Sequence, residues 1–378
     1  MLADGAALQA IRRTDQDNVH WRPMVFNCPL ARIVVATIVA AGCRLPEPAP
    51  PPPVRRVPGF LKGQTHAHSN NSGDSDTPAA DVLRWYAARG YDFVVFTDHN
   101  YVTVVPPDER PPGILAIPGA ELTENLRSCE PPPPRGLSCL LHVNALFLPN
   151  LRGGMMFVRH KSERRFDVFQ GAVRAAVGSG GLAQINHPNF HYAADSALLA
   201  AVTREGATFL EIANEAIDSN NAGDAGHPGT EALWDAVLST GATIWGVASD
   251  DAHHYDDAAA VRASGEMAFT GDRGFVMVRA PKDVPAIRAA MARGDFYSSN
   301  GVLLSGIDRD ADGALFIQVA EASPEEHRIL CIGKEGRVLA EMEGRAGRCP
   351  PPAPGGYVRA VVVDRAGRRA WVQPSTKF

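Results

Sequence analysis

Residues 62–100 read KGQTHAHSNNSGDSDTPAADVLRWYAARGYDFVVFTDHN, and this stretch joins two apolar runs through one amphipathic helical segment. The first run ends in a His-x-His pair, His66 and His68, and the second ends at His99. Thr77 is predicted to cap the helix ahead of a proline, and a glycine ends it. The stretch therefore predicts a β-strand, an α-helix and a second β-strand, with histidines at both strand ends.

The same alternation of strands and helices continues over more than two hundred residues. The apolar runs that predict strands are 62–66, 92–97, 114–122, 140–148, 181–186, 208–213 and 242–248. The segments with helical periodicity are 78–89, 166–176, 195–202, 231–239 and 284–293. This order predicts an α/β protein whose parallel βα units close into a barrel or a wound sheet.

The pattern changes after about residue 300, where short alternating runs are separated by turns rich in Gly, Asp and Pro. These runs are 314–319, 328–332, 356–363 and 370–373. Because no helical period is evident, we expect a small antiparallel β-sandwich. A bond between Cys331 and Cys349 would hold it together.

Residues 1–43 predict an export signal. The apolar run IVVATIVAAG (33–42) is too short to span a bilayer as a helix but has the length of a signal-peptide core. Its end resembles a bacterial lipobox, in which Cys43 would be lipidated; the alternative is a buried N-terminal strand. Residues 44–59, which contain PEPAPPPPV (46–54), predict an extended Pro-rich linker. The earlier residues do not resemble a fold, so translation is expected to start at Met24.

The net charge and the cysteines indicate which partners and which cellular compartment to expect. With 42 acidic and 37 basic residues the net charge is −5, so no nucleic-acid partner is expected. Among six cysteines, Cys129 with Cys139, and Cys331 with Cys349, have spacings that close small loops. Disulfides, and hence the periplasm or cell envelope of a bacterium, are expected; ordinary buried thiols are the alternative.

Nine imidazole and carboxylate side chains fall at or near the ends of the predicted strands, where functional groups of βα folds gather. They are His66, His68, Asp74, His99, Glu121, His142, His187, Asp251 and His253. Nitrogen and oxygen ligands without thiolate suit zinc, manganese or iron, and nine ligands imply two or three ions. A single strand-end histidine is more often structural, but burying so many ionisable groups without a cation would be costly.

Two positions in this set stay open. The acidic loop offers Asp74 or Asp76, of which spacing favours Asp74. Asp250 and His254 stand next to predicted ligands, so the assignment there could be wrong by one residue.

Six motifs resemble the PHP (polymerase and histidinol phosphatase) metallohydrolases in order and spacing. They are HAHS (66–69), TDHN (97–100), PGAE (118–121), LHVNAL (141–146), INHP (185–188) and SDDAH (249–253). Trp234-Asp235, FYSSNG (296–301) and AWVQP (370–374) are similar to the carbaryl-hydrolase-like branch. The resemblance, over residues 60–375, implies a distorted seven-stranded (βα) TIM-like barrel at 60–300, followed by the β-sandwich at 301–378.

The resemblance also implies a trinuclear metal site. His66, His68, Glu121 and Asp251 would hold one ion, Glu121 with His142 and His187 a second, and Asp74, His99 and His253 a third. Glu121, Asp251 and His99 would be the catalytic residues. A hydroxide shared between two ions would then attack a phosphate ester, or a carboxylic or carbamate ester, of a small molecule.

Other polar residues are expected to touch the substrate or to support a ligand. They are Asp98, Asn100, Glu211, Asn214, His254, Arg159 and Lys161. The basic loop 150–165, NLRGGMMFVRHKSERR, could clamp an anion, although a solvated loop is the favoured interpretation. No nucleophilic Ser elbow, phosphate-binding Gly loop or Cys nucleophile is evident.

Two other functions remain open from the sequence. One is an exported, metal-stabilised binding protein that recognises a glycan or a protein through its C-terminal β domain. The other is an intracellular phosphatase, which would require that the N-terminus is not an export signal. A membrane is expected as a partner only through lipid on Cys43, and the sequence does not predict an oligomeric state.

Overall fold

The structure is a computed structural model that describes residues 57–149, 152–158, 161–323 and 326–377. The described residues belong to one compact unit. The predicted signal segment with Cys43, and the Pro-rich linker as far as residue 56, lie outside the described residues.

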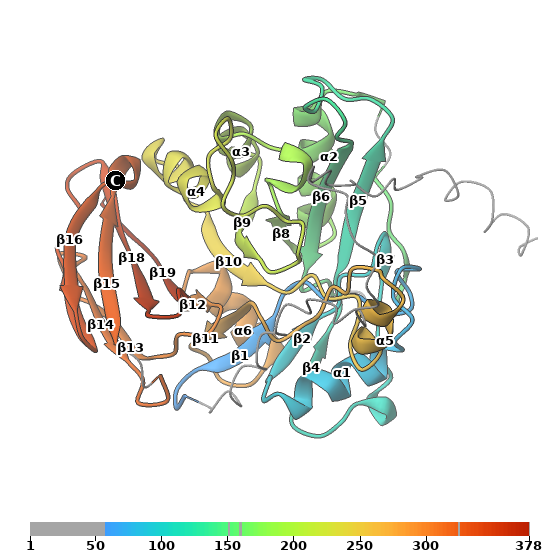
Figure 1. The fold of residues 1–378 in the computed structure, drawn as a ribbon, viewed down its shortest axis with the longest axis horizontal. Coiled ribbons are helices and arrows are strands. Elements are labelled where there is room, and N and C mark those ends of the chain that lie inside the picture. The colour runs from blue at the N-terminus through green and yellow to red at the C-terminus, as the bar shows by residue number, and fades with distance from the viewer. Residues whose placement is uncertain (1–56, 150–151, 159–160, 324–325, 378) are drawn as a thin grey trace, which may run out of the picture. The chain divides into compact units, whose positions relative to one another are not determined.

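The larger sheet has nine strands and mixes parallel with antiparallel pairs (Figure 1). In spatial order they are β16 (Val338–Glu343), β15 (His327–Gly333), β18 (Gly356–Asp364), β19 (Arg369–Lys377), β12 (Phe296–Ser299), β11 (Phe275–Val278), β1 (Leu61–Gln64), β2 (Phe93–Val95) and β4 (Leu115–Ile117). Strands β1, β2 and β4 run parallel, whereas β11 and β12 run antiparallel to their neighbours.

The second sheet has five strands and lies beneath three helices. Its order is β10 (Trp245–Ser249), β9 (Ala207–Asn214), β8 (Leu182–Ile185), β6 (Cys139–Leu146) and β5 (Ala120–Leu126). Helices α2 (Arg165–Gly178), α3 (Ser196–Arg204) and α4 (Thr230–Ser239) pack side by side along β6, β8 and β9 (Figure 1). Their buried apolar residues form one core with the strands, in agreement with the predicted helical periodicity.

The remaining elements are short. They are the sheet of β13 (Leu304–Arg309), β14 (Leu315–Val319) and β17 (Ala346–Cys349), the pair of β3 (Tyr101–Val102) and β7 (Gly154–Met155), the helices α1 (Ala79–Ala88), α5 (Ala258–Ala263) and α6 (Val284–Ala292), and the 3₁₀ turns η1 (Pro107–Glu109), η2 (Phe190–Tyr192) and η3 (Lys334–Gly336). Helix α1 has Pro78 rather than Thr77 at its N-cap and no side-chain cap. Gly90 ends this helix in the left-handed conformation, as predicted.

The chain crosses from the first sheet to the second at Pro118 and Gly119. The sequence predicts one strand over 114–122, but the structure has β4 on one side of this pair and β5 on the other, in different sheets. A Cβ on Gly119 would lie 2.7 Å from the Phe96 carbonyl oxygen and 2.8 Å from that of Ala145. Only glycine fits at this close approach of three backbone segments.

The predicted seven-stranded (βα) barrel is wrong. The described residues contain nineteen strands but six α-helices, and the sheets are open and mixed, with no closed barrel. Strand β6 runs antiparallel to β5 and β8, and β11 runs antiparallel to β1. The chain between β2 and β4 contains the short strand β3 and one 3₁₀ turn, and β5 and β6 form a hairpin. Neither connection contains an α-helix. Some of the apolar runs that we interpreted as strands of repeated βα units therefore form antiparallel pairs.

The C-terminal strands also depart from the predicted separate β-sandwich. Strand β19 pairs with β18 on one side and with β12 on the other, so β15, β16, β18 and β19 extend the sheet that contains β1. Only β13, β14 and β17 form a sheet of their own. The two predicted domains thus share one continuous sheet.

Both predicted disulfides are present. Cys129 and Cys139 close the tip of the β5–β6 hairpin, with Cα atoms 5.9 Å apart. Cys331 of β15 and Cys349 of β17 join the nine-stranded sheet to the three-stranded sheet, with Cα atoms 5.4 Å apart. The prediction of two local bonds from loop spacing is confirmed.

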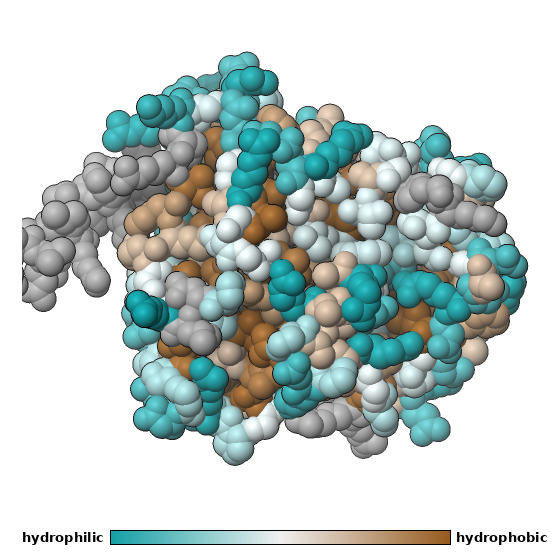
Figure 2. Space-filling model, turned by 180° about the vertical axis from the view of Figure 1, so that it is seen from behind, coloured by the Kyte–Doolittle hydropathy of each residue, from teal (hydrophilic) through white to brown (hydrophobic). Residues whose placement is uncertain are grey.

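The described surface exposes a few large apolar side chains, from Met155 and Phe157 at β7 to Val338 and Leu339 at β16. On the face seen in Figure 2, apolar areas near the middle are bordered by hydrophilic side chains. No helix within the described ranges has the length and apolarity of a membrane span.

Candidate metal centre

The nine predicted ligands converge on one place from seven segments of the chain. His66 and His68 follow β1, His99 follows β2, His187 follows β8, and Asp251 and His253 follow β10. Glu121 and His142 lie within β5 and β6, and Asp74 lies in the loop before α1. Three groups bring their ligand atoms within 4.8 Å of one another: His66, His68 and Glu121; Glu121, His142 and His187; and His68, Asp74, His99 and His253. The described residues thus contain groups that could hold a metal ion.

Asp251 completes the first of these groups. Its Oδ1 lies 3.1 Å from His66 Nε2 and 3.0 Å from His68 Nε2. Its φ of 51° is in the left-handed region, which is unusual for a residue with a side chain and marks a turn held by its surroundings. Asp250 is fully buried elsewhere and accepts hydrogen bonds from Gln64 Nε2 and from the Tyr86 hydroxyl. Asp251, not Asp250, therefore faces the histidines.

Glu121 occupies the middle of the cluster and is 1% exposed. Its Oε1 lies 3.1 Å from His142 Nδ1 and 3.5 Å from the Nε2 atoms of His66 and His187. Its Oε2 lies 2.6 Å from His99 Nδ1. Burial disfavours the ionised carboxylate, but His142, His99 and His66 outweigh it and hold the pKa of Glu121 well below its usual value. With His68 Nε2 at 3.8 Å from its Oε2, Glu121 is thus a carboxylate shared by five imidazoles.

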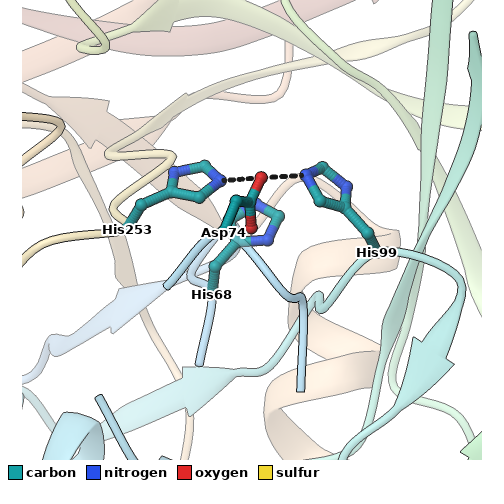
Figure 3. Close-up of side chains that lie close together, drawn as sticks. All are labelled: His68, Asp74, His99 and His253. Atoms are coloured by element: carbon teal, nitrogen blue, oxygen red, sulfur yellow. Dashed lines mark hydrogen bonds and ion pairs between the residues drawn. The ribbon is translucent and has the colours of Figure 1, made fainter. Parts of the chain in front are cut away.

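Asp74 joins the outer histidines of the cluster. Figure 3 shows one of its carboxylate oxygens between His253 and His99, with His68 nearby, and this oxygen lies 3.0 Å from His99 Nε2 and 3.4 Å from His253 Nε2. The rings of His68 and His253 stack with centroids 4.0 Å apart. Asp74 is half exposed, so this is the open side of the cluster. Asp76 belongs to none of the three groups, so Asp74 is the member of the acidic loop that reaches the histidines.

In three histidines, the ring nitrogen that faces away from the cluster has a hydrogen-bond partner that determines the tautomer. His66 Nδ1 lies 2.7 Å from a Glu211 oxygen, His253 Nδ1 lies 3.0 Å from the Asp251 carbonyl, and His142 Nε2 lies 2.9 Å from the Asn125 amide oxygen. Each partner is an acceptor, so each of these nitrogens carries the hydrogen. The opposite nitrogen then points a lone pair at the carboxylates of the cluster. Imidazoles that ligate metals are held in this way.

The buried atoms at the centre test whether a cation fits. His66 Nε2 is buried and makes no hydrogen bond, although Asp251 and Glu121 oxygens lie 3.1 and 3.5 Å away. A lone pair facing two carboxylates is repulsive unless a proton or a metal ion lies between them. The donor set therefore fits a divalent cation with nitrogen and oxygen ligands.

The pKa shifts show how strongly the carboxylates of the cluster attract positive charge. Burial lowers the pKa of His66, but Asp251, Glu211 and Glu121 outweigh it and raise the pKa well above its usual value. The carboxylates likewise overcome burial and raise the pKa of His99, His187 and His253. His68 and His142 differ: burial together with His253 and His99 lowers the pKa of His68 to about 3, and burial also lowers the pKa of His142. A metal ion would take the place of the protons that these carboxylates attract.

The other predicted site residues have varied positions. Asp98 is buried, accepts from the Ser69 hydroxyl at 2.8 Å, and supports the loop that carries His68. Asn100 donates to the Thr123 carbonyl at 3.2 Å and adopts a φ of 52° directly after His99. His254 accepts from the Phe269 backbone N–H at 3.1 Å and stacks on the Phe269 ring. These side chains order the surroundings of the cluster.

The basic side chains of the loop 150–165 do not act together in the part of the loop that the structure describes. Lys161 is exposed, and Arg159 lies outside the described residues. Arg165 is buried and donates to the backbone carbonyls of Tyr192 and Ala193 at 2.6 and 3.1 Å. Arg165 therefore stabilises α2 against the segment after β8 and is not available to clamp an anion.

Several supporting residues were not found from the sequence. Asn186 Nδ2 donates to Glu121 Oε1 at 2.8 Å, Thr123 Oγ1 lies 2.7 Å from His99 Nδ1, and Ser72 Oγ lies 2.7 Å from His68 Nδ1. Thr123 lies two positions after Glu121 on the same face of β5, so the alternation of a strand was the available signal. For Ser72 and Asn186 no signal separates them from other polar residues.

A comparison of the chain with protein-family models and with curated proteins gives no match. The chemistry of the centre therefore rests on its own residues and their geometry.

Proposed function

We propose that this protein is a metal-dependent hydrolase that cleaves a phosphate ester, or a carboxylic or carbamate ester, of a small molecule. The observation that carries the proposal is the position of Glu121, a buried carboxylate within 4 Å of five imidazoles, those of His66, His68, His99, His142 and His187. The resemblance of six sequence motifs to the PHP metallohydrolases supports the same chemistry, although the barrel expected with it is not part of the proposal.

We assign two or three ions of zinc, manganese or iron to the cluster. His66, His68, Glu121 and Asp251 would hold the first, Glu121 with His142 and His187 the second, and Asp74, His99 and His253 the third. Bound divalent ions lower the pKa of water toward about 7 and polarise the oxygen of an ester. A substrate would enter from the side of the cluster where Asp74 lies, because this side chain is half exposed.

The chain's own residues would set the charge at the reacting centre. Glu121 and Asp251 are ionised there because neighbouring histidines hold their pKa values well below the usual range against the effect of burial. His99 lies between Glu121 and the open side at Asp74, since its Nδ1 is 2.6 Å from Glu121 and its Nε2 is 3.0 Å from Asp74. We therefore assign catalytic roles to Glu121, Asp251 and His99.

Metal analysis and a substrate panel on one sample test the proposal. We expect purified full-length protein to contain more than one equivalent of zinc, manganese or iron. It should hydrolyse at least one chromogenic ester from a panel of phosphomonoesters, phosphodiesters, carboxylic esters and carbamates. A chelator should abolish the hydrolysis, and metal should restore it. Protein that carries no metal, or whose hydrolysis survives chelation, would contradict the proposal.

A second candidate is an exported, metal-stabilised binding protein. A cavity of about 960 Å³ lies between α4 and the C-terminal strands, lined by Glu231, Arg359, Arg369 and Trp371 among others, and its size suits a small ligand. This candidate predicts that chelation lowers the melting temperature while every ester in the panel remains uncleaved. Chelator-sensitive hydrolysis would exclude it.

We also propose that the protein is exported, with lipid on Cys43 as its membrane anchor. The two disulfides support this, because such bonds persist in oxidising compartments. Fractionation combined with thiol labelling is expected to find the mature protein in the cell envelope with Cys129 and Cys139 unreactive. Recovery from the cytosol with both thiols free would contradict export.

A further inference from the structure

Glu211 of β9 is completely buried directly behind the metal centre. It accepts five hydrogen bonds, from His66 Nδ1 at 2.7 Å, Ser249 Oγ at 2.6 Å, Gln184 Nε2 at 3.1 Å, the His187 backbone N–H at 2.6 Å and Asn214 Nδ2 at 2.9 Å. Two carboxylate oxygens offer about four acceptor positions, so these donors fill its capacity. Glu211 belongs to none of the groups of potential metal ligands. Glu211 therefore has no acceptor position left for a metal ion or a substrate.

Three of the five donors come from strand ends that carry proposed ligands. His66 follows β1, His187 follows β8, and Ser249 ends β10 just before Asp251. Asn214 extends the link, because its amide donates both to Glu211 and, at 3.1 Å, to Asp251 Oδ2. One carboxylate thus holds ligands of the first and second proposed ions in a fixed relation.

We propose that Glu211 is a positioning residue that fixes the tautomer of His66 and couples His66, His187 and Asp251 into one preformed unit. The proposal rests on the proposed metal centre, though not on its hydrolytic activity. A buried carboxylate on Nδ1 forces the lone pair of His66 onto Nε2, the atom that faces Glu121 and Asp251. Asp74, His99 and His253 have no contact with Glu211, so the third position does not depend on it.

Glu211→Gln tests the proposal, because it keeps the size of the side chain but replaces an acceptor by a donor. In competition between zinc-loaded full-length protein and a chromogenic chelator, we expect the variant to lose zinc affinity by roughly 10- to 100-fold at two positions, the effect typical of such supporting residues. One position should keep the wild-type affinity.

Glu215→Gln is the matched control. Glu215 lies four residues further along the chain and is largely buried, and its side chain accepts a hydrogen bond from Asn300 Nδ2 at 3.0 Å. It has no contact with the cluster, so its variant should bind zinc as the wild type does. A loss in the control equal to that in Glu211→Gln would assign the effect to general destabilisation and overturn the proposal.

The imidazole proton of His66 provides a readout that a merely structural role would not move. In the zinc-loaded wild type, a nuclear magnetic resonance signal of the His66 Nδ1–H should be displaced far downfield by its bond to the carboxylate. It should move upfield or disappear in Glu211→Gln. An unchanged signal with unchanged zinc affinity would overturn the proposal.

Asn214→Ala gives a second test if Glu211→Gln does not fold. This variant removes the link between Glu211 and Asp251 and leaves the bond to His66 intact. We expect about a tenfold loss of zinc affinity at one position, the lower end of the range for supporting residues, with the His66 signal retained. Wild-type affinity in Asn214→Ala would contradict the coupling. A wild type that holds zinc but cleaves no ester would refute the proposed hydrolase and leave the role of Glu211 intact.

Discussion

Replacing Glu121 by Gln is expected to empty two metal positions and to lower hydrolysis of the best ester by roughly 10³-fold or more. The amide removes the negative charge that five imidazoles surround, at a place where the side chain is 1% exposed. A metal ion contributes several kcal/mol of charge stabilisation to a hydrolytic transition state, and about 1.4 kcal/mol corresponds to each tenfold in rate. Metal content and kcat/KM, measured on the same preparation, check the prediction.

Glu124→Gln is the control for this experiment. Glu124 lies on the same strand, β5, but three positions later and hence on the opposite face. It should keep wild-type metal content and activity. If Glu121→Gln retained both metal and hydrolysis, the assignment of Glu121 as the shared ligand, and with it the proposed function, would be wrong.

Replacing Asp235 by Ala is expected to destabilise the fold by about 3–5 kcal/mol, because it removes the closer counter-ion of a buried arginine and leaves only the 3.5 Å contact with Glu231. Arg359 is 1% exposed, and its Nε and Nη2 lie 2.7 and 2.6 Å from the two Asp235 oxygens. The Tyr357 hydroxyl also donates to Asp235, at 2.7 Å. Chemical denaturation of wild type and variant measures the loss. The metal content of the folded variant should not change, since neither residue belongs to the cluster.

An exposed ion pair provides the comparison. Arg328 and Glu341 lie 2.9 Å apart with about half of each side chain exposed. Glu341→Ala should cost no more than about 1 kcal/mol, as is usual for surface pairs. Asp235 lies in α4 and Arg359 in β18, and equal effects of the two substitutions would contradict the expected cost of breaking this buried pair.

Local structure could largely be predicted from the sequence, whereas strand direction could not. The predicted strand at 181–186 and helix at 284–293 agree closely with β8 and α6, because periodicity and helix boundaries are local properties. The direction of β6 depends on the hairpin that connects it to β5, and the sheet change at Gly119 depends on backbone atoms of Phe96 and Ala145. Such contacts lie between segments far apart in the chain. The run FVMV of β11 was too short to be recognised as a strand.

Part of the candidate site could be predicted from the sequence, again because some of its features are local. Histidines and acids after apolar runs, such as His99 and His187, could be identified because strand ends meet at one edge of a sheet. The choice between Asp74 and Asp76 depends on the path of a loop, and the choice between Asp250 and Asp251 depends on one left-handed residue. The full role of Glu211 depends on donors from three separate strands.

The place of β19 in the large sheet has a consequence for how the protein is made. Strand β19 is the most C-terminal element described, yet it lies between β12 and β18 and not at an edge. On the ribosome, residues 61–364 would emerge before the strand that joins the two halves of this sheet exists. The unpaired edges of β12 and β18 would stay exposed to chaperones or to other chains until residue 377 has left the exit tunnel. The pairing of this sheet is therefore complete only after β19, the last of its strands along the chain, has been synthesised.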